Sequence, residues 1–248
     1  MKHGKSVTGF AVFMLAALVL NGCDSADDSD ISNTDFEASA EFSYTIDVTN
    51  HTTMRVDAVN GTVVIRAIPN AGSVVIAGER RVGSESLADA RDFLRRLTVN
   101  VAESGDEIVA RTEQPGDARG RECIVDYDVT IPADMEINID HINGIVVLED
   151  IESDTYVDLI NGTLTSSIDL PIDGTVDMTV INGTMTLEIP ATTSAHLTAA
   201  VTNGELHVSN LDFTSRHETD QSISGVLGVG DGSIRLAVIN GTLDLKGR

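Results

Sequence analysis

The chain has 248 residues, of which 39 are acidic and 16 are lysine or arginine, for a formal net charge of −23. Such a charge repels nucleic acid and anionic lipid headgroups, so neither is expected as a partner. The length allows one moderate domain or a continuous repeat array. Because the chain has no tryptophan, it offers few aromatic faces on which sugars or bases could stack.

Residues 1–22 have the features of a bacterial export signal. Lys2 and Lys5 precede an unbroken apolar run over residues 10–20, which is shorter than the roughly 20 residues that a membrane-spanning helix needs. The segment that follows, Leu20-Asn21-Gly22-Cys23, resembles the lipobox of bacterial lipoproteins, in which cleavage before the cysteine is coupled to its acylation. We therefore expect Cys23 to carry lipid, palmitate included, that anchors the protein to a bacterial membrane.

An acidic tether is predicted over residues 23–40. The stretch 24–30 is rich in aspartate and has little to bury, so it is expected to be disordered. Asp24 directly after the cysteine resembles an inner-membrane retention signal, whereas Ala26-Asp27-Asp28 resembles the acidic export tag of some surface lipoproteins. Both leaflets stay open, and the expected location is the cell envelope, facing the periplasm or exposed on the surface.

The body of the protein is predicted to span residues 41–248 and to begin with irregularly spaced strands. Alternating apolar residues indicate strands over 42–48, 54–59 and 62–68. A further pair over 97–101 and 107–112 is expected to turn at Gly105-Asp106.

One short helix is predicted in this half, over residues 84–97. Leu87, Ala90, Leu94 and Leu97 would line one face, and Ser86 with Asp89 is typical of a capped helix start. Cys123 comes before the apolar pair Ile124-Val125 and, with Cys23 lipidated, has no intramolecular partner. We expect it to be a buried, inert thiol.

Asn-Gly occurs six times, and the flanks of each copy share one pattern. The positions four and two residues before the Asn, and three and five residues after it, are almost all apolar and alternate with polar residues. This is the period of a strand with one buried face. The last five copies are 18, 21, 21 and 37 residues apart, which indicates an insertion or an unmarked repeat before the final copy. The six asparagines are Asn60, Asn143, Asn161, Asn182, Asn203 and Asn240.

Two all-β architectures fit this pattern. Asn-Gly is a strong signal for a tight hairpin, which would give an antiparallel β-meander or sandwich. Alternatively, each unit of roughly 20 residues is one coil of a β-solenoid, with Asn-Gly at a corner and like residues stacked from coil to coil. Stacked asparagines can then hydrogen bond along the ladder. We favour the solenoid.

The Asn-Gly units, the segment 125–132 and the closing segment 228–241 resemble the bacterial "putative adhesin" family of β-strand-repeat proteins. The resemblance covers residues 41–248 and implies a right-handed β-helix-like body on a membrane-anchored protein of unknown function. It transfers no catalytic residue.

The sharpest candidate site is a column of aspartates three residues before the Asn. It holds Asp57, Asp140 and Asp158, and in stacked coils Asp140 and Asp158 would be about 5 Å apart on the outer face. Carboxylates so close must be separated by water, share a proton or hold a cation, so Asp140 and Asp158 are the candidate metal ligands, with calcium as the metal. His141 belongs to an apolar column and is expected to be partly buried.

We find no nucleophile elbow, zinc-binding spacing or phosphate loop in the sequence, so it predicts neither an enzyme nor a cofactor. The expected function is a non-enzymatic envelope lipoprotein whose rigid β surface binds an envelope protein, a polysaccharide or another cell. The alternative is a carbohydrate-active enzyme of the β-helix type, a polysaccharide lyase or hydrolase, although Asp140 and Asp158 on a convex surface would lack the cleft that such chemistry needs. A third possibility is an envelope signalling or stress factor.

Overall fold

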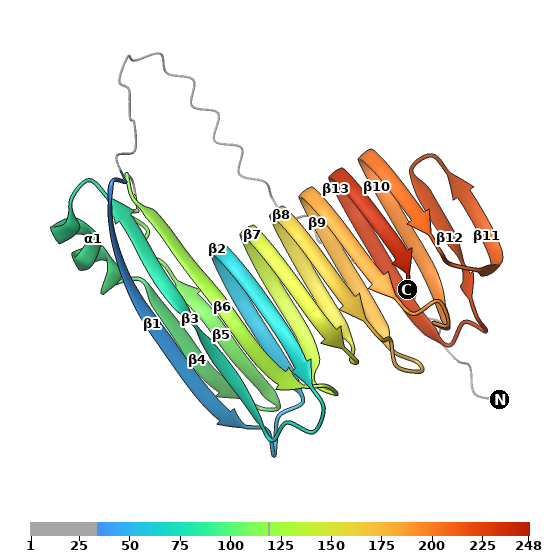
Figure 1. The fold of residues 1–248 in the computed structure, drawn as a ribbon, viewed down its shortest axis with the longest axis horizontal. Coiled ribbons are helices and arrows are strands. Elements are labelled where there is room, and N and C mark those ends of the chain that lie inside the picture. Colours follow the sequence, from blue (N-terminus) through green and yellow to red (C-terminus); the bar gives the residue numbers. More distant parts are fainter. Residues whose placement is uncertain (1–33, 119) are drawn as a thin grey trace, which may run out of the picture. The chain divides into compact units, whose positions relative to one another are not determined.

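A computed structural model describes residues 34–118 and 120–248 of the protein. The described residues belong to one compact unit. The predicted signal, Cys23 and most of the predicted tether lie outside the described residues. The described part holds one helix, α1 (Leu87–Leu94), and thirteen strands (Figure 1), which are β1 (Phe36–Asp47), β2 (Thr53–Ile68), β3 (Ser73–Ser84), β4 (Thr98–Ser104), β5 (Glu107–Glu113), β6 (Glu122–Pro132), β7 (Glu136–Ile151), β8 (Thr155–Ile168), β9 (Thr175–Ile189), β10 (Ala195–Ser209), β11 (Phe213–Thr219), β12 (Ser222–Leu227) and β13 (Gly232–Gly247).

Six long strands form the centre of the sheet and pair in parallel, in the spatial order β2, β7, β8, β9, β13, β10. In each pairing, Asn lies beside Asn and Gly beside Gly, from Asn60 at one end to Asn203 at the other. The all-β prediction and the stacking of like residues are therefore confirmed. The antiparallel meander does not describe these six strands, because they pair with one another only in parallel; among them, β10 alone has an antiparallel partner in the described chain, β12.

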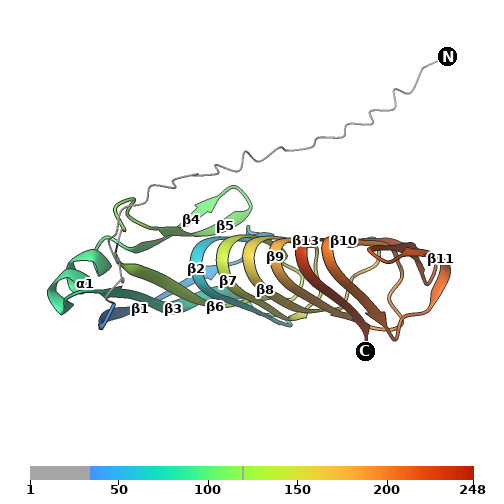
Figure 2. The same cartoon turned by 90° about the horizontal axis from the view of Figure 1, so that it is seen from above.

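Each central strand bends at its Asn-Gly. In β8, Val157 and Leu159 are buried before the bend, and Leu164 and Ser166 are buried after it. The buried residues of β8 thus have odd numbers before the bend and even numbers after it. This shift by one position lets both arms of the strand face the same interior. Figure 2 shows the central strands as a series of arches. The core lies inside these arches and is made of the apolar columns that the sequence pattern predicts.

The glycine of each bend has no space for a side chain. Gly162 has a φ of +144°, and a Cβ built on it would lie 1.8 Å from the carbonyl oxygen of Gly144 in the next layer. Only glycine adopts this conformation readily and permits such a close approach of two backbones. The repeated glycine is therefore required by the stacking itself as well as by the bend.

Among the six central strands, the order of the layers differs from the order of the chain only in the exchange of β10 and β13. β13 inserts between β9 and β10, so the unit that ends the sequence is not the last layer. The hairpin of β11 and β12 occupies the long interval before Asn240, which confirms the predicted insertion. At the other end, Asn60 of β2 stacks on Asn143 of β7 across 83 residues of sequence. Because all units share the same apolar columns, the sequence pattern does not specify which unit pairs with which.

The N-terminal half of the unit departs from the predicted strand boundaries. β1 begins at Phe36, earlier than the predicted start at residue 41, and pairs antiparallel with β3. The strands predicted over 54–59 and 62–68 are the two arms of one strand, β2, because strand pairing continues without a break through the bend at Asn60-Gly61. The strand pair turning at Gly105-Asp106 is confirmed as β4 and β5.

The helix is shorter than predicted, and its predicted buried face is confirmed in part. Ser86 accepts a hydrogen bond from the backbone N–H of Asp89 at 3.2 Å, as its predicted capping role requires. Ala90 and Leu97 are buried as predicted, whereas Leu87 is 37% exposed. The helix also buries Phe93, its largest apolar side chain. α1 contacts β1 and β3. No helix within residues 34–118 and 120–248 is long and apolar enough to cross a membrane.

Candidate binding surface

The asparagines at the bends form a continuous hydrogen-bonded ladder. From Asn143 to Asn203, each side-chain amide donates from Nδ2 to Oδ1 of the asparagine in the layer before it, over distances of 2.7 to 2.9 Å. The ladder starts at Asn60, whose Nδ2 donates to the backbone carbonyl of Cys123 at 3.1 Å. These bonds join the layers at their bends in addition to the backbone pairing, so the outer surface beside the bends is held rigidly.

An aliphatic side chain precedes the asparagine in five of the six layers. These residues lie at the outside of the bends, where Ile142 and Ile239 are each 40% exposed and the other three are half-buried. We call this row the corner ridge. Neighbouring layers of a sheet are about 4.8 Å apart, so the ridge is an almost continuous apolar strip along the stack. In the spatial order of the layers, the corner ridge consists of Val59, Ile142, Ile160, Ile181 and Ile239.

A second outward row lies on the other side of the asparagine ladder, two residues after each Asn. Four of its members are threonines, namely Thr62, Thr163, Thr184 and Thr242, and they are stacked in register with Ile145. Ile145 is 46% exposed, which widens the apolar strip in the layer of Ile142. The bends together therefore present a rigid surface of exposed aliphatic groups beside amides and hydroxyls.

The predicted column of aspartates is present, and the structure brings its members together. Asp140 pairs in register with Asp57 on one side and with Asp158 on the other. The Nε of Arg55 donates to Asp57 at 2.8 Å, and its Nη2 donates to Asp140. Arg111 also donates to Asp57, at 2.6 Å. Arginines therefore compensate much of the charge at this end of the column.

Asp158 has no ion-pair partner among the residues that the structure describes. Burial, followed by the charge of Asp140, raises the pKa of the Asp158 carboxyl above its usual range. Calcium takes six to eight oxygen ligands, more than these two carboxylates supply. In the described segments, no group of three or more His, Cys, Asp or Glu side chains is arranged to hold a metal ion. The calcium site at Asp140 and Asp158 stays a prediction, which a calorimetric calcium titration tests.

The two other residues singled out from the sequence are buried. His141 is 2% exposed, and its Nε2 lies 3.1 Å from the carbonyl oxygen of Gly61, which accepts the hydrogen bond. Burial lowers the pKa of His141, so the neutral ring is favoured. Cys123 is 3% exposed, and burial raises the pKa of its thiol. Both residues therefore belong to the core.

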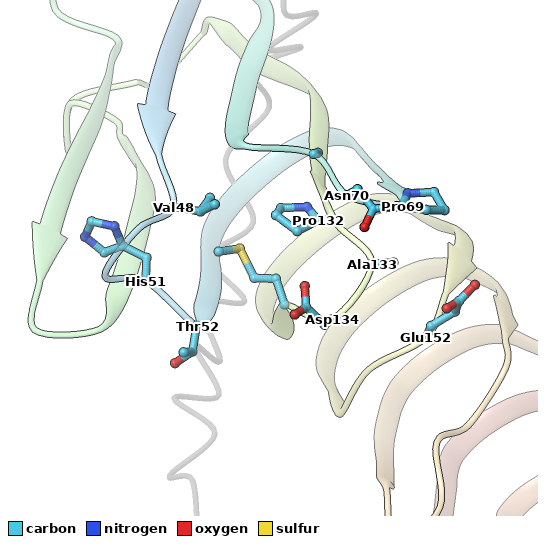
Figure 3. A pocket seen from close by; sticks show the side chains of 11 residues that line it. Val48, His51, Thr52, Pro69, Asn70, Pro132, Ala133, Asp134 and Glu152 are labelled. Atoms are coloured by element: carbon cyan, nitrogen blue, oxygen red, sulfur yellow. The ribbon is translucent and has the colours of Figure 1, made fainter.

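A hollow of about 530 Å³ lies among the turns that connect β1 to β2, β2 to β3, β6 to β7 and β7 to β8. Figure 3 places His51 and Glu152 at opposite ends of this hollow, with Pro132 and Asp134 between them. The ring of His51 lies against Glu103, with Nε2 3.3 Å from the carboxylate, and against the carbonyl oxygen of Asp47. His51 is thus held by residues that do not line the hollow, and the other side chains do not form a nucleophile with an adjacent base.

Sequence reasoning missed the corner ridge, although its signal is in the sequence. Ile-Asn-Gly occurs four times, at Ile142, Ile160, Ile181 and Ile239. The alternating pattern led us to expect polar residues at outward positions. The missed signal is the aliphatic residue that recurs directly before Asn-Gly, a position at which the alternation of the strand directs the side chain towards the protein surface.

The fold and this surface define an all-β repeat protein with a long, regular and partly apolar outer surface. No family model matches the chain, and no curated protein matches it in sequence. Among solved structures it is similar to a "putative cell adhesion protein" from Clostridium sporogenes, with a TM-score of 0.57 and 11% identity over 85% of this chain and 100% of that chain. A "putative adhesin" from Bacteroides fragilis aligns over 83% of this chain and 97% of that chain, with a TM-score of 0.27 and 10% identity. At such identities, the first similarity shows a shared fold alone, and the second carries no argument.

Proposed function

We propose that this protein is a non-enzymatic lipoprotein of the bacterial cell envelope that acts as an adhesin by binding another protein along the corner ridge. The observation that carries the proposal is the ridge itself, with Ile142 and Ile239 each 40% exposed in a row of five stacked aliphatic residues. A contiguous exposed apolar strip with polar groups beside it is typical of a protein interaction site. We further propose that the stacked arches are coils of a right-handed β-solenoid, as the family resemblance implies.

The chemistry of the surface favours a protein partner over a polysaccharide. Sugar-binding sites usually stack sugar rings on aromatic side chains, whereas the ridge is made of isoleucine and valine. The formal net charge of −23 opposes binding of acidic polysaccharides and anionic lipid. An apolar strip on the partner protein would bury the ridge without such repulsion.

Rigidity supports the same function. Every layer is held by backbone pairing and by an amide of the asparagine ladder, so the ridge has little conformational freedom to lose when it binds. Preorganised surfaces bind more tightly for a given contact area because that entropic cost is small. The predicted tether, whose last residues from Phe36 onward belong to β1, would be attached to lipid at Cys23 and would allow this rigid surface to meet partners beyond the membrane.

The binding proposal is tested with cells that display the full chain. We expect the double variant Ile160→Lys/Ile181→Lys to abolish attachment of these cells to a protein-coated surface or to a second cell. The matched control is Thr165→Lys/Thr186→Lys, which adds the same charges to outward positions of the same two strands. Attachment should persist in the control. Equal attachment of the ridge variant and the wild type would show that the ridge is not the binding surface.

The anchor and the absence of catalysis have separate tests. Cys23→Ser should release the protein from the membrane fraction and remove the mass of the lipid, and a variant that stays in that fraction at the wild-type mass would refute lipidation. The wild-type chain is expected to leave acidic polysaccharides intact. Turnover that is lost in Asp140→Asn or Asp158→Asn would instead identify the chain as a carbohydrate-active enzyme.

A further inference from the structure

The last layer of the stack is only half covered. β12 pairs with the first arm of β10, over Ala195–Ala200. The second arm, Asn203–Ser209, pairs with β13 on one side, and no described strand pairs with its other side. This arm therefore presents a row of backbone N–H and C=O groups along an open sheet edge, which is a template for another strand.

The last residues of two apolar columns, which lie on the same arm, are not fully covered. Leu206 and Val208 are half-buried, whereas their neighbours in β13, Leu243 and Leu245, are 0% exposed. The residues in these columns of the inner layers are likewise buried because a strand covers each of them on both sides. One more strand on the open edge would cover Leu206 and Val208 in the same way.

The two ends of the asparagine ladder also differ. At the β2 end, Asn60 donates to the carbonyl of Cys123, and the sheet continues through β6, β3 and β1. At the β10 end, Asn203 donates to Asn240 at 2.9 Å. Within the described residues, no group donates to Oδ1 of Asn203. The ladder thus ends on an exposed acceptor, and an additional asparagine would continue it in the same direction.

The hairpin of β11 and β12 limits what can occupy this edge. It extends the sheet beyond the first arm of β10 by two strands, in the place where the first arm of another arch would stack. A second copy of the chain, stacked end to end as a complete arch, would overlap this hairpin. The open place has room for a single strand beside the second arm.

We propose that the second arm of β10 binds an extended strand of another polypeptide, added in parallel to the open edge. The strand that fits carries Asn-Gly, followed by aliphatic residues at the third and fifth positions after the Asn. β13 has this sequence and already pairs in parallel with the opposite edge of β10. The incoming asparagine donates to Asn203. The incoming glycine is needed because every ladder glycine after Gly61 lies against the carbonyl of the glycine in the layer before it. This edge is separate from the corner ridge, and its proposal stands independently of the adhesin proposal.

The test uses the full chain and a labelled synthetic peptide with the sequence of residues 237–247. We expect saturable binding by fluorescence anisotropy. We also expect slower amide hydrogen exchange confined to residues 203–209. Two altered peptides serve as controls, Asn240→Asp, which lacks the amide donor, and Gly241→Ala, whose methyl group would meet the carbonyl of Gly204. Both should fail to bind.

Two protein variants locate the site. Val208→Lys places a charge on the inward side of the open arm and should abolish binding, since inward lysines block strand addition. His207→Lys adds the same charge on the outward side of the same arm and should bind like the wild type. Thermal melting of both variants establishes that they are folded. The peptide measurements on the wild type do not depend on either variant.

Several outcomes would overturn the proposal. Equal binding of the native and Gly241→Ala peptides would exclude a ladder-like strand. Faster exchange in β13, without protection of residues 203–209, would mean that the peptide replaces β13. A concentration-dependent dimer that is lost in Val208→Lys would show that a second copy occupies the edge.

Discussion

Replacing a single ladder glycine by alanine tests the stacked architecture most directly. In Gly162→Ala, the new Cβ would lie 1.8 Å from the carbonyl oxygen and 2.8 Å from the carbonyl carbon of Gly144, at a φ of +144°. The backbone strain of a non-glycine residue in this region costs about 1–3 kcal/mol. Because the contacted atoms are backbone, the two layers must also separate, which weakens hydrogen bonds worth about 1 kcal/mol each. The lower entropy of the unfolded alanine chain offsets about 0.4–1 kcal/mol.

The net expectation for Gly162→Ala is a loss of about 3 kcal/mol in the free energy of unfolding. For a domain of this size, each kcal/mol lowers Tm by about 2–4 °C, so Tm should fall by roughly 6–12 °C. Thermal and urea unfolding of the full chain, followed by circular dichroism, measure both quantities.

Two other glycines separate the contributions. Gly105 has a φ of +68° with nothing within 4 Å of a built Cβ, so Gly105→Ala should show the backbone strain alone, about 1 kcal/mol. Gly72 has neither a positive φ nor a neighbour within 4 Å, so Gly72→Ala should leave Tm unchanged or raise it slightly. If Gly162→Ala melts at the temperature of Gly105→Ala, the close approach of the layers, and with it the stacking, is wrong.

Three further predictions concern the ladder and two titrating groups. Asn161→Ala removes one donated and one accepted amide hydrogen bond, each 2.8 Å long, and should lower the free energy of unfolding in urea by about 2 kcal/mol. Asn203→Ala removes one such bond and should lower it by about half as much. Equal losses would contradict a ladder that ends at Asn203. Burial lowers the pKa of His141 from 6.5, so the neutral ring stabilises the fold above that pH and stability falls as the pH drops below it. Tm measured between pH 7 and pH 5 should therefore decline more steeply in the wild type than in His141→Leu, and parallel profiles would refute this role. Hydrogen bonds from Arg121 and Ser84 lower the pKa of Asp89 from 3.8 to about 2, so its contribution is present above pH 3.8 and is lost as the pH falls towards 2. Asp89→Asn should flatten the Tm profile in that acid range, and an unchanged slope would show that Asp89 does not contribute.

The sequence pattern was sufficient for the layers themselves because their causes are local. Alternation around each Asn-Gly predicts which side chains are buried, and Val157 and Leu164 are buried as expected. The stacking of Asp140 beside Asp158 and the burial of His141 follow from the same columns.

The helix face shows where local reasoning fails. The apolar spacing selected Leu87, Ala90, Leu94 and Leu97, of which Ala90 and Leu97 are 0% exposed, but it missed Phe93, which is 1% exposed. Arg96 and Arg121 then lie over the Phe93 ring, with guanidinium carbons 4.8 and 4.5 Å from its centre. Arg121 is distant in sequence, so its contact with the ring was not available to a pattern that considers only neighbouring residues.

The sequence by itself determined what each unit is: a strand with one buried face, a bend that only glycine permits, and an asparagine able to bond to its equivalent. These properties depend on residues within a few positions of one another. Only the tertiary structure decided that β13 lies between β9 and β10, that the isoleucines before the asparagines form one exposed ridge, and that the second arm of β10 has no described neighbour on its outer side. Units with the same columns are interchangeable as neighbours, so their order depends on contacts between segments far apart in the chain.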